Sequence, residues 1–208
     1  MTEEEPGDRL TDLWAWADED DAYEPDPVDP EVVTAVMVVH DAEDWLPEQL
    51  SALRALTVRP ERLVAVDNGS TDDSGRLLAE ALAQGILDEV VPGDAQWSFG
   101  RAVSEALGDD IPGWIWLLHD DSAPRPHALE RLLKAAPLAD VLYPKLLQPP
   151  RRNYPDTLSE VGQSITMGGH RVLTVEEGDI DQHQVDPSAV LGGSTAGMLV
   201  RGTTWTEL

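Results

Sequence analysis

Short apolar segments alternate with longer segments of helical spacing from residue 31 onward. The stretch VVTAVMVV at 32–39 is apolar at every position except one threonine, which is typical of a strand covered on both faces. Apolar residues then recur at Leu46, Leu50 and Leu53, the i, i+4, i+7 spacing of a helix, and Pro47 suits its first turn. This first unit predicts a buried strand followed by an amphipathic helix.

The same alternation continues along most of the chain. Further strands are expected at 62–66, 86–91, 113–118 and 139–147, and further helices at 69–85, 100–107 and 127–136. Strands separated by helices in this way predict an α/β fold with a doubly wound, mainly parallel sheet and helices on both faces. After residue 150 the pattern changes, and we expect a C-terminal β-hairpin that turns near Gly168 and Gly169 and a last strand at 194–200. Residues 31–208 are therefore predicted to form one domain.

The first 30 residues have a different composition. They hold twelve acidic residues and one base, Arg9, and prolines stand at 25, 27 and 30. Acid-rich, proline-rich segments bury too little apolar surface to fold alone. We expect residues 1–30 to be a disordered acidic tail, in which Trp14 and Trp16 form one short element able to dock on the domain or on a partner.

Composition narrows the possible functions and the location. The formal net charge of −26 disfavours nucleic acid and anionic membrane surfaces as partners, because both reward clustered Lys and Arg. There is no cysteine for disulfides or thiolate metal sites, and no apolar run approaches the roughly 18 residues of a membrane span. These features predict a cytoplasmic protein with no membrane span in this chain.

Polar residues follow the predicted strands directly. His40 and Asp41 come after the first, Asp67 and Asn68 after the second, and WIWLLHDDSAP at 114–124 runs from a strand into adjacent carboxylates. Ligands bind beyond the carboxyl ends of strands in an open parallel sheet. Like charges placed so close repel, so the acid pair suggests a hard divalent cation, Mn²⁺ or Mg²⁺. Each site also has a structural interpretation, because Asp67 is typical of a turn and Asp41 of a helix start.

Two of these elements carry a resemblance to a known family. VDNGSTDDS at 66–74, followed by WLLHDDSAP at 116–124, resembles the nucleotide-sugar-dependent glycosyltransferases of family 2, which have the GT-A fold. The resemblance covers roughly residues 31–208. It implies metal-dependent, inverting transfer of a sugar from a UDP, GDP or dTDP sugar to a glycan or lipid-linked acceptor, in cell-envelope glycan biosynthesis. It also allows a place at the inner face of the membrane in a longer parent protein.

The resemblance implies a base-binding role for the first two strand ends. Asp67, in the DNGS element, takes the position of the aspartate that hydrogen-bonds the nucleotide base, and Asn68 lies beside it. Val39, His40 and Asp41 take the position of the other wall of the nucleotide pocket.

The remaining donor contacts are implied at two later elements. Gly100 and Arg101 resemble the glycine-containing loop that opens a helix beneath the donor, where Arg101 meets a phosphate or remains a surface charge. His119, Asp120 and Asp121 align with the Asp-x-Asp signature, which makes Asp121 a metal ligand together with Asp120. The chain departs from the family at His119, and the ribose contact falls either to Asp120 or to the imidazole.

The resemblance places the family's catalytic base in an acidic motif beyond the last residue of this chain, so we expect a C-terminally incomplete enzyme without its general base. Asp181, Asp186, Glu176 and Glu177 are candidate substitutes, although a solvated acidic loop is the favoured interpretation. An alternative function is a non-catalytic nucleotide-binding or partner-binding remnant. A response-regulator-like receiver is disfavoured because its acid pair would follow the first strand.

Deleting residues 1–30 is expected to leave the melting temperature and the nucleotide affinity unchanged, because the predicted core begins at residue 31. Thermal unfolding and calorimetric titration of both chains measure this. A large fall in melting temperature would show instead that the Trp14 and Trp16 segment packs on the domain.

Overall fold

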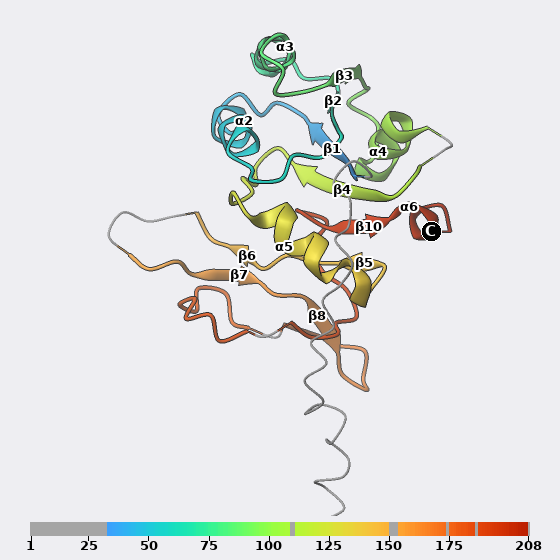
Figure 1. The fold of residues 1–208 in the computed structure, drawn as a ribbon. Helices are drawn as coiled ribbons and strands as arrows, with labels where there is room; N and C mark the ends of the chain where they lie inside the picture. Colours follow the sequence, from blue (N-terminus) through green and yellow to red (C-terminus); the bar gives the residue numbers. More distant parts are fainter. Residues whose placement is uncertain (1–32, 109–110, 150–153, 174, 186, 208) are drawn as a thin grey trace, which may run out of the picture.

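The computed structural model describes residues 33–108, 111–149, 154–173, 175–185 and 187–207 (Figure 1). The acidic tail expected at residues 1–30 lies outside these residues. The strands are β1 Val33–Val39, β2 Arg62–Asp67, β3 Glu89–Pro92, β4 Trp114–His119, β5 Val141–Leu142, β6 Leu146–Leu147, β7 Leu158–Glu160, β8 Gln163–Ile165, β9 Arg171–Leu173 and β10 Leu199–Arg201. The helices are α2 Leu46–Arg54, α3 Ser74–Ala83, α4 Phe99–Leu107, α5 Ala128–Ala135, the 3-10 turn η3 Ala136–Leu138 and α6 Gly202–Trp205.

The main sheet has the strand order β3-β2-β1-β4-β10-β5. Strands β1 to β4 are parallel to one another, whereas β10 runs antiparallel to both β4 and β5. The prediction of a mainly parallel, doubly wound sheet is therefore confirmed. The order reverses direction at β1, where the chain first winds outward to β2 and β3 and later returns to β4.

Helices cover both faces of this sheet, as Figure 1 shows for α2 and α4. One core joins β1, β2 and β4 to α2, α3 and α5, and the other joins these strands and β10 to α4. Strand β4 serves both cores by the alternation of a pleated strand. Trp114, Trp116 and Leu118 belong to the first core, and Ile115 and Leu117 to the second.

The prediction of one continuous strand at 139–147 is wrong. This segment divides into β5 and β6, which pair with different partners, β10 and β7. Pro144 lies between them and offers no backbone N–H for a continuing ladder. The last strand is also shorter than expected, because the chain turns between Thr195 and Met198 before β10 starts at Leu199.

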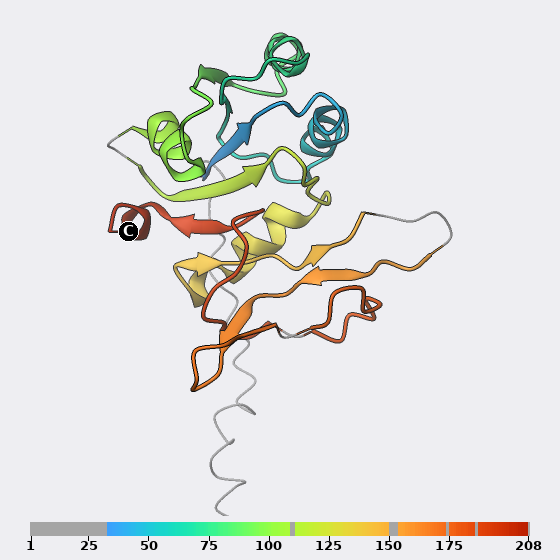
Figure 2. The ribbon, with the colours of Figure 1, turned by 180° about the vertical axis from the view of Figure 1, so that it is seen from behind.

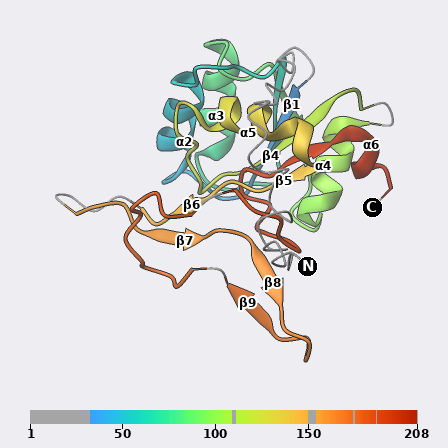
Figure 3. The same cartoon turned by 60° about the horizontal axis from the view of Figure 1, so that its bottom comes forward.

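The C-terminal part forms two small two-stranded sheets beside the main one. Strands β8 and β9 pair antiparallel and turn through Gly168 and Gly169, which confirms the expected hairpin. Figure 3 shows this hairpin pointing away from the α/β part, and Figure 2 shows β6 and β7 side by side from behind. Among the described residues, no helix combines the length and the apolarity that crossing a bilayer needs.

Glu130 on α5 joins this helix to the segment that follows α2. Its carboxylate accepts hydrogen bonds from Nδ1 of His127 (2.9 Å), Nζ of Lys134 (3.0 Å) and Oγ1 of Thr57 (3.0 Å). These bonds, with that of His127 the largest cause, lower the pKa of Glu130 from 4.5 to about 2. A carboxylate with a lowered pKa stabilises the folded chain above its unfolded-state pKa, and this contribution is lost as the pH falls toward the folded-state value.

Glu130→Gln is therefore expected to lower the melting temperature at pH 7, because a neutral amide replaces the charged acceptor. The difference from wild type should narrow as the pH falls from about 4.5 to about 2, the interval in which wild-type Glu130 takes up its proton. Thermal scans across this pH range measure the difference. Glu61→Gln, at an exposed residue, is the matched control. A difference between Glu130→Gln and wild type that stays constant with pH would contradict the role given to this carboxylate.

Candidate functional site

The carboxyl ends of the four parallel strands lie level with one another. The register places Val39 opposite Asp67, Val38 opposite His119, and Asp67 opposite Pro92. Residues that follow β1, β2, β3 and β4 therefore meet along one edge of the sheet. We call this edge the rim, and all the strand-end residues singled out in the sequence belong to it.

The segments that follow β1 and β2 are bonded to each other at the rim. Asp41, in a left-handed conformation with φ of 48°, donates its backbone N–H to Oγ of Ser70 (3.1 Å). Its Oδ1 accepts the backbone N–H of Thr71 (2.7 Å), and this bond is the main cause that lowers the pKa of Asp41. The carboxylate of Asp41 is thus used to hold the DNGS segment in place.

A second pair of carboxylates continues the same connection. Glu43 donates its backbone N–H to Oδ2 of Asp72 (2.9 Å), and Oε2 of Glu43 accepts the backbone N–H of Asp73 (3.0 Å). Oδ1 of Asp72 also accepts the backbone N–H of Ser74 (2.9 Å). Burial acts to raise the pKa of Asp72, but the bonds to Ser74 and Glu43 outweigh it and the pKa is lowered. Sequence reasoning missed this role of Glu43, since a single acid in a loop carries no recognisable pattern.

Asp67 and Asn68 stand at the end of β2. Oδ1 of Asp67 accepts the backbone N–H of Ser70 (2.9 Å), so this aspartate does cap the turn that follows it. Its Oδ2 lies over Gly75, where a Cβ would come within 3.3 Å of it. Asn68 is buried, and its Nδ2 donates to the carbonyl of Trp97 (3.1 Å). The backbone carbonyl of Asn68 lies 3.0 Å from Nδ1 of His40. Both residues therefore shape the turn and retain a further side-chain oxygen.

Gly69 is required for this turn. Its φ is +77°, and a Cβ there would lie 2.7 Å from the backbone N of Ala95 in the segment after β3. The DNGS turn and the segment after β3 are thus in direct backbone contact, which only a glycine permits.

Asp120 and Asp121 follow β4 and differ in their surroundings. Oδ2 of Asp120 accepts the backbone N–H of His40 (2.9 Å), so this carboxylate ties β4 to the end of β1. Burial raises the pKa of Asp120, the negative charge of Asp121 adds to that rise, and the His40 bond opposes both. Asp121 is exposed, and within the part of the chain that the structure describes its carboxylate has no hydrogen-bond partner.

A buried glutamine supports the end of β4 from α2. Gln49 is only 1% exposed, and its Nε2 donates to the carbonyl of His119 (3.0 Å), the residue before the acid pair. Its Oε1 is buried without a partner among the described residues. Sequence reasoning missed Gln49, although a glutamine on the apolar face that carries Leu46, Leu50 and Leu53 is itself a signal.

The side chain of His119 lies on the face of the sheet that α4 covers. Its Nε2 lies 2.8 Å from Oγ1 of Thr195, and its ring lies 4.8 Å from that of Phe99 at the start of α4. Ser98 caps this helix by accepting the backbone N–H of Arg101 (3.3 Å). The guanidinium of Arg101 lies 5.1 Å from the centre of the Trp97 ring and remains exposed.

The carboxylates of the rim supply only part of the ligands that a hard cation needs. Among the described residues, no group of three or more His, Asp or Glu side chains is arranged to hold a metal ion. A protein commonly supplies Mg²⁺ with only one or two carboxylates, while phosphates and water fill its other positions. Asp120 and Asp121 fit this arrangement, in which the ligand completes the site.

The expectation of a solvated acidic loop after β9 is wrong for Asp181. Its side chain is 3% exposed, its Oδ2 lies 2.5 Å from Nζ of Lys145, and the bond to Lys145 is the main cause that lowers its pKa. A carboxylate bound in this way is a poor candidate for a general base. Glu176 and Glu177 are exposed, as expected, and Asp186 lies outside the described residues.

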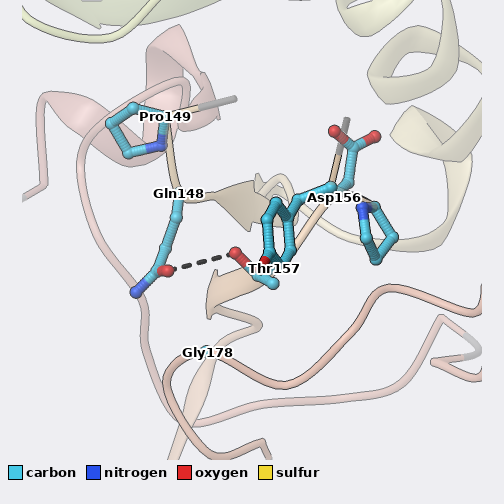
Figure 4. Close-up of a pocket in the computed structure, with 7 residues that line it drawn as sticks. Gln148, Pro149, Asp156, Thr157 and Gly178 are labelled. Atoms are coloured by element: carbon cyan, nitrogen blue, oxygen red, sulfur yellow. Dashed lines mark hydrogen bonds between the residues drawn. The ribbon is translucent and has the colours of Figure 1, made fainter. Parts of the chain in front are cut away.

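A shallow pocket of about 300 Å³ lies at the β6–β7 hairpin (Figure 4). Figure 4 shows the side chains of Gln148 and Thr157 bonded to each other (3.0 Å) beside Asp156 and Gly178. Asp156 also pairs with Arg125 (2.6 Å). None of the described residues that line this pocket belongs to the rim, and these three polar side chains all have partners within the chain.

Comparison with protein families identifies the chain. The family described as glycosyl transferase family 2 matches residues 34–179, which is more than half of the sequence. The chain therefore belongs to glycosyltransferase family 2. A search of curated proteins finds no match.

Solved structures with the same fold are distant in sequence. The mannosyltransferase PcManGT from Pyrobaculum calidifontis, in complex with GDP-Man and Mn²⁺, is 19% identical with a TM-score of 0.50, over 64% of this chain and 41% of that protein. Residues 1–349 of TarS from S. aureus are 18% identical with a TM-score of 0.47, over 62% of this chain and 41% of that one. The likeness to PcManGT confirms the expected GT-A fold. This chain spans less than half the length of either protein.

Ser74→Ala is expected to destabilise the rim. Ser74 is fully buried, and its Oγ accepts the backbone N–H of Ala42 (2.8 Å), which would be left buried without a partner. Such a loss costs about 1–3 kcal/mol of the free energy of unfolding. Urea denaturation measures it, with Ser51→Ala at an exposed position of α2 as the control. Equal stability of Ser74→Ala and this control would contradict the role of Ser74.

Proposed function

We propose that the rim binds a nucleoside diphosphate sugar together with Mn²⁺ or Mg²⁺, and that the protein transfers the sugar to a glycan or lipid-linked acceptor. The observation that carries this proposal is the position of the acid pair. Asp120 and Asp121 follow β4 at the level of Asp67, and the His40 N–H holds Asp120 in place at 2.9 Å. Membership of glycosyltransferase family 2 supports the same reaction class.

The nucleotide base is assigned to the ends of β1 and β2. Asp67 offers the carboxylate that accepts a hydrogen bond from the base, and Gly75 leaves its Oδ2 uncrowded. His40 and Asp41 are exposed and are assigned to the other side of the base, whereas Val39 is fully buried behind them. The carboxylate of Asp41 and Nδ1 of His40 are bonded within the chain, so these groups shape the base site and leave hydrogen bonding with the base to Asp67.

The diphosphate is assigned to the end of β4. Asp121 is the main metal ligand, because its carboxylate is exposed and has no hydrogen-bond partner among the described residues, and Asp120 offers the oxygen that His40 does not use. A bound cation would compensate the two carboxylates and stabilise the charge that develops on the departing diphosphate. PcManGT was solved with Mn²⁺, which agrees with this assignment.

The formal charge of −26 makes the cation more important. An anionic diphosphate approaching so acidic a protein needs local positive charge. Gly100 and Arg101 lie in the first turn of α4. The exposed guanidinium of Arg101 is paired with Glu105 at 3.7 Å and would exchange this partner for a phosphate. Inversion of the sugar would in addition need a carboxylate base beside the acceptor hydroxyl. Lys145 binds Asp181, so this role is assigned to no described residue.

Calorimetric titration of UDP, GDP and dTDP, with and without Mn²⁺, tests the donor site. One nucleotide is expected to bind only with Mn²⁺, because the acid pair repels a bare diphosphate. Asp67→Ala should weaken this binding by about ten-fold, the weight of one hydrogen bond to a charged group. Asp121→Ala should abolish the Mn²⁺-dependent binding, because it removes the main metal ligand. Glu61→Gln, at the amino end of β2, is the control.

The outcomes separate the candidate functions. Unchanged Mn²⁺-dependent binding in Asp121→Ala would contradict the metal assignment. Failure of all three nucleotides to bind the wild-type chain would remove the donor site altogether. Binding without release of the sugar from the matching nucleotide sugar would favour a non-catalytic nucleotide-binding protein.

A further inference from the structure

The rim continues beyond β4 to the segment that leads into β10. Because β10 is antiparallel to β4, residues 193–198 meet the carboxyl end of β4. The backbone N–H of Gly197 donates to Leu117 (2.8 Å), and the N–H of Leu117 donates to Met198 (2.8 Å). The order along the rim is therefore β2, β1, β4 and then residues 193–198.

A donor laid along this rim places its groups in the same order. With the base at Asp67 and the diphosphate at Asp121, the sugar extends away from the base, past the end of β4. The next element in that direction is the segment 193–198. On the proposed function, this segment is the part of the described chain that faces the sugar.

The side chain of His119 is directed to this segment. His119 lies on the face of β4 that carries Ile115 and Leu117, next to α4, and its ring packs against Phe99 at 4.8 Å. Its Nε2 and Oγ1 of Thr195 are 2.8 Å apart, a hydrogen bond whichever of them donates. The neighbouring Asp120 turns the other way, to the backbone N–H of His40, which follows β1.

The rest of the segment is held by groups outside the rim. The backbone N–H of Ser194 donates to Oε1 of Glu160 on β7 (2.9 Å), and a Cβ on Gly193 would lie 2.6 Å from the ring of Tyr143. Nε1 of Trp116 donates to the carbonyl of Gly197 (3.1 Å). The His119–Thr195 bond is thus the connection between the segment and the residue directly before the acid pair.

We propose that His119 is a positioning residue, which fixes Thr195 beside the donor sugar and makes no contact with the nucleotide. This proposal rests on the proposed donor site. It explains why an imidazole suits position 119, because an aspartate side chain is shorter and would not reach Thr195 from the same backbone. His119 and Thr195 together then set which sugar the rim accepts.

Three variants test this role. Thr195→Val removes the hydroxyl at constant shape, His119→Asp shortens the side chain, and His119→Gln keeps an amide near the position of Nε2. Thr203→Val, at an exposed residue of α6, is the matched control. Two quantities are measured for each variant of the 208-residue chain. The first is amide hydrogen exchange of peptides covering 190–198 without ligand, and the second is the affinity for the bound nucleoside diphosphate and for its sugar conjugate with Mn²⁺.

Thr195→Val and His119→Asp are expected to raise exchange in 190–198. They should also weaken binding of the nucleotide sugar by about three- to ten-fold, which corresponds to the loss of one hydrogen bond. The affinity for the nucleoside diphosphate should stay within about two-fold of wild type. The double variant that combines Thr195→Val with His119→Asp should lose no more affinity for the nucleotide sugar than either single variant, because both changes remove the same hydrogen bond. His119→Gln should keep both the hydrogen exchange of 190–198 and the nucleotide-sugar affinity close to wild type, which a general loss of stability would not allow.

Other results overturn the proposal. A fall in nucleoside diphosphate affinity for both His119 variants, with Thr195→Val unchanged, would make His119 a direct nucleotide contact. Unaltered exchange in Thr195→Val and His119→Asp would remove the positioning role, whatever the affinities. If the wild-type chain binds no nucleotide, the donor site and the sugar role fail together. Raised exchange in Thr195→Val and His119→Asp would then support only the hydrogen bond between His119 and Thr195.

Discussion

The hydrogen bond from the His40 N–H to the Asp120 carboxylate joins the two central strands at the place where the candidate chemistry lies. Strands β1 and β4 are neighbours in the sheet although they are far apart in the chain. Their parallel register brings the ends level, and this bond then fixes the direction of the first carboxylate. Gln49 acts on the same strand end through the carbonyl of His119. The second carboxylate, on Asp121, is left exposed as a consequence of how the first is held.

The acidic residues of the rim differ in how far their oxygens are used within the chain, and Asp67 and Asp120 each use one. Asp41, Glu43 and Asp72 direct their oxygens to backbone N–H groups, and the bonds at Asp41 and Asp72 keep the pKa of these carboxylates low. Such carboxylates supply hydrogen-bond acceptors for backbone N–H groups in two adjacent loops, so they belong to the structure of the turn. Asp121 has no such bond among the described residues. An acid-rich sequence can therefore contain few carboxylates that remain available to a ligand.

The sequence pattern predicted the sheet because its central strands are continuous apolar runs, and the DNGS and HDD elements follow those runs directly. Features that depend on three-dimensional partners were not predictable in this way. The division at Pro144 depends on β10 and β7 as separate partners, and the burial of Asp181 depends on Lys145. The bonds of Gln49 and of His119 likewise depend on elements 70 and 76 residues away. The roles proposed for the rim residues toward a ligand remain predictions.

The position of β10 between β4 and β5 has a consequence for the order of folding. Strand β5 precedes β10 in the chain, yet its only strand partner in the described sheet is β10. The strands β1 to β4 can assemble as soon as residue 119 has left the ribosome, whereas β5 must wait until residue 201 arrives. Contacts of such long sequence separation are slow to form. During synthesis the edge of β4 therefore stays open for the time needed to add about 80 residues, several seconds at cellular rates of elongation.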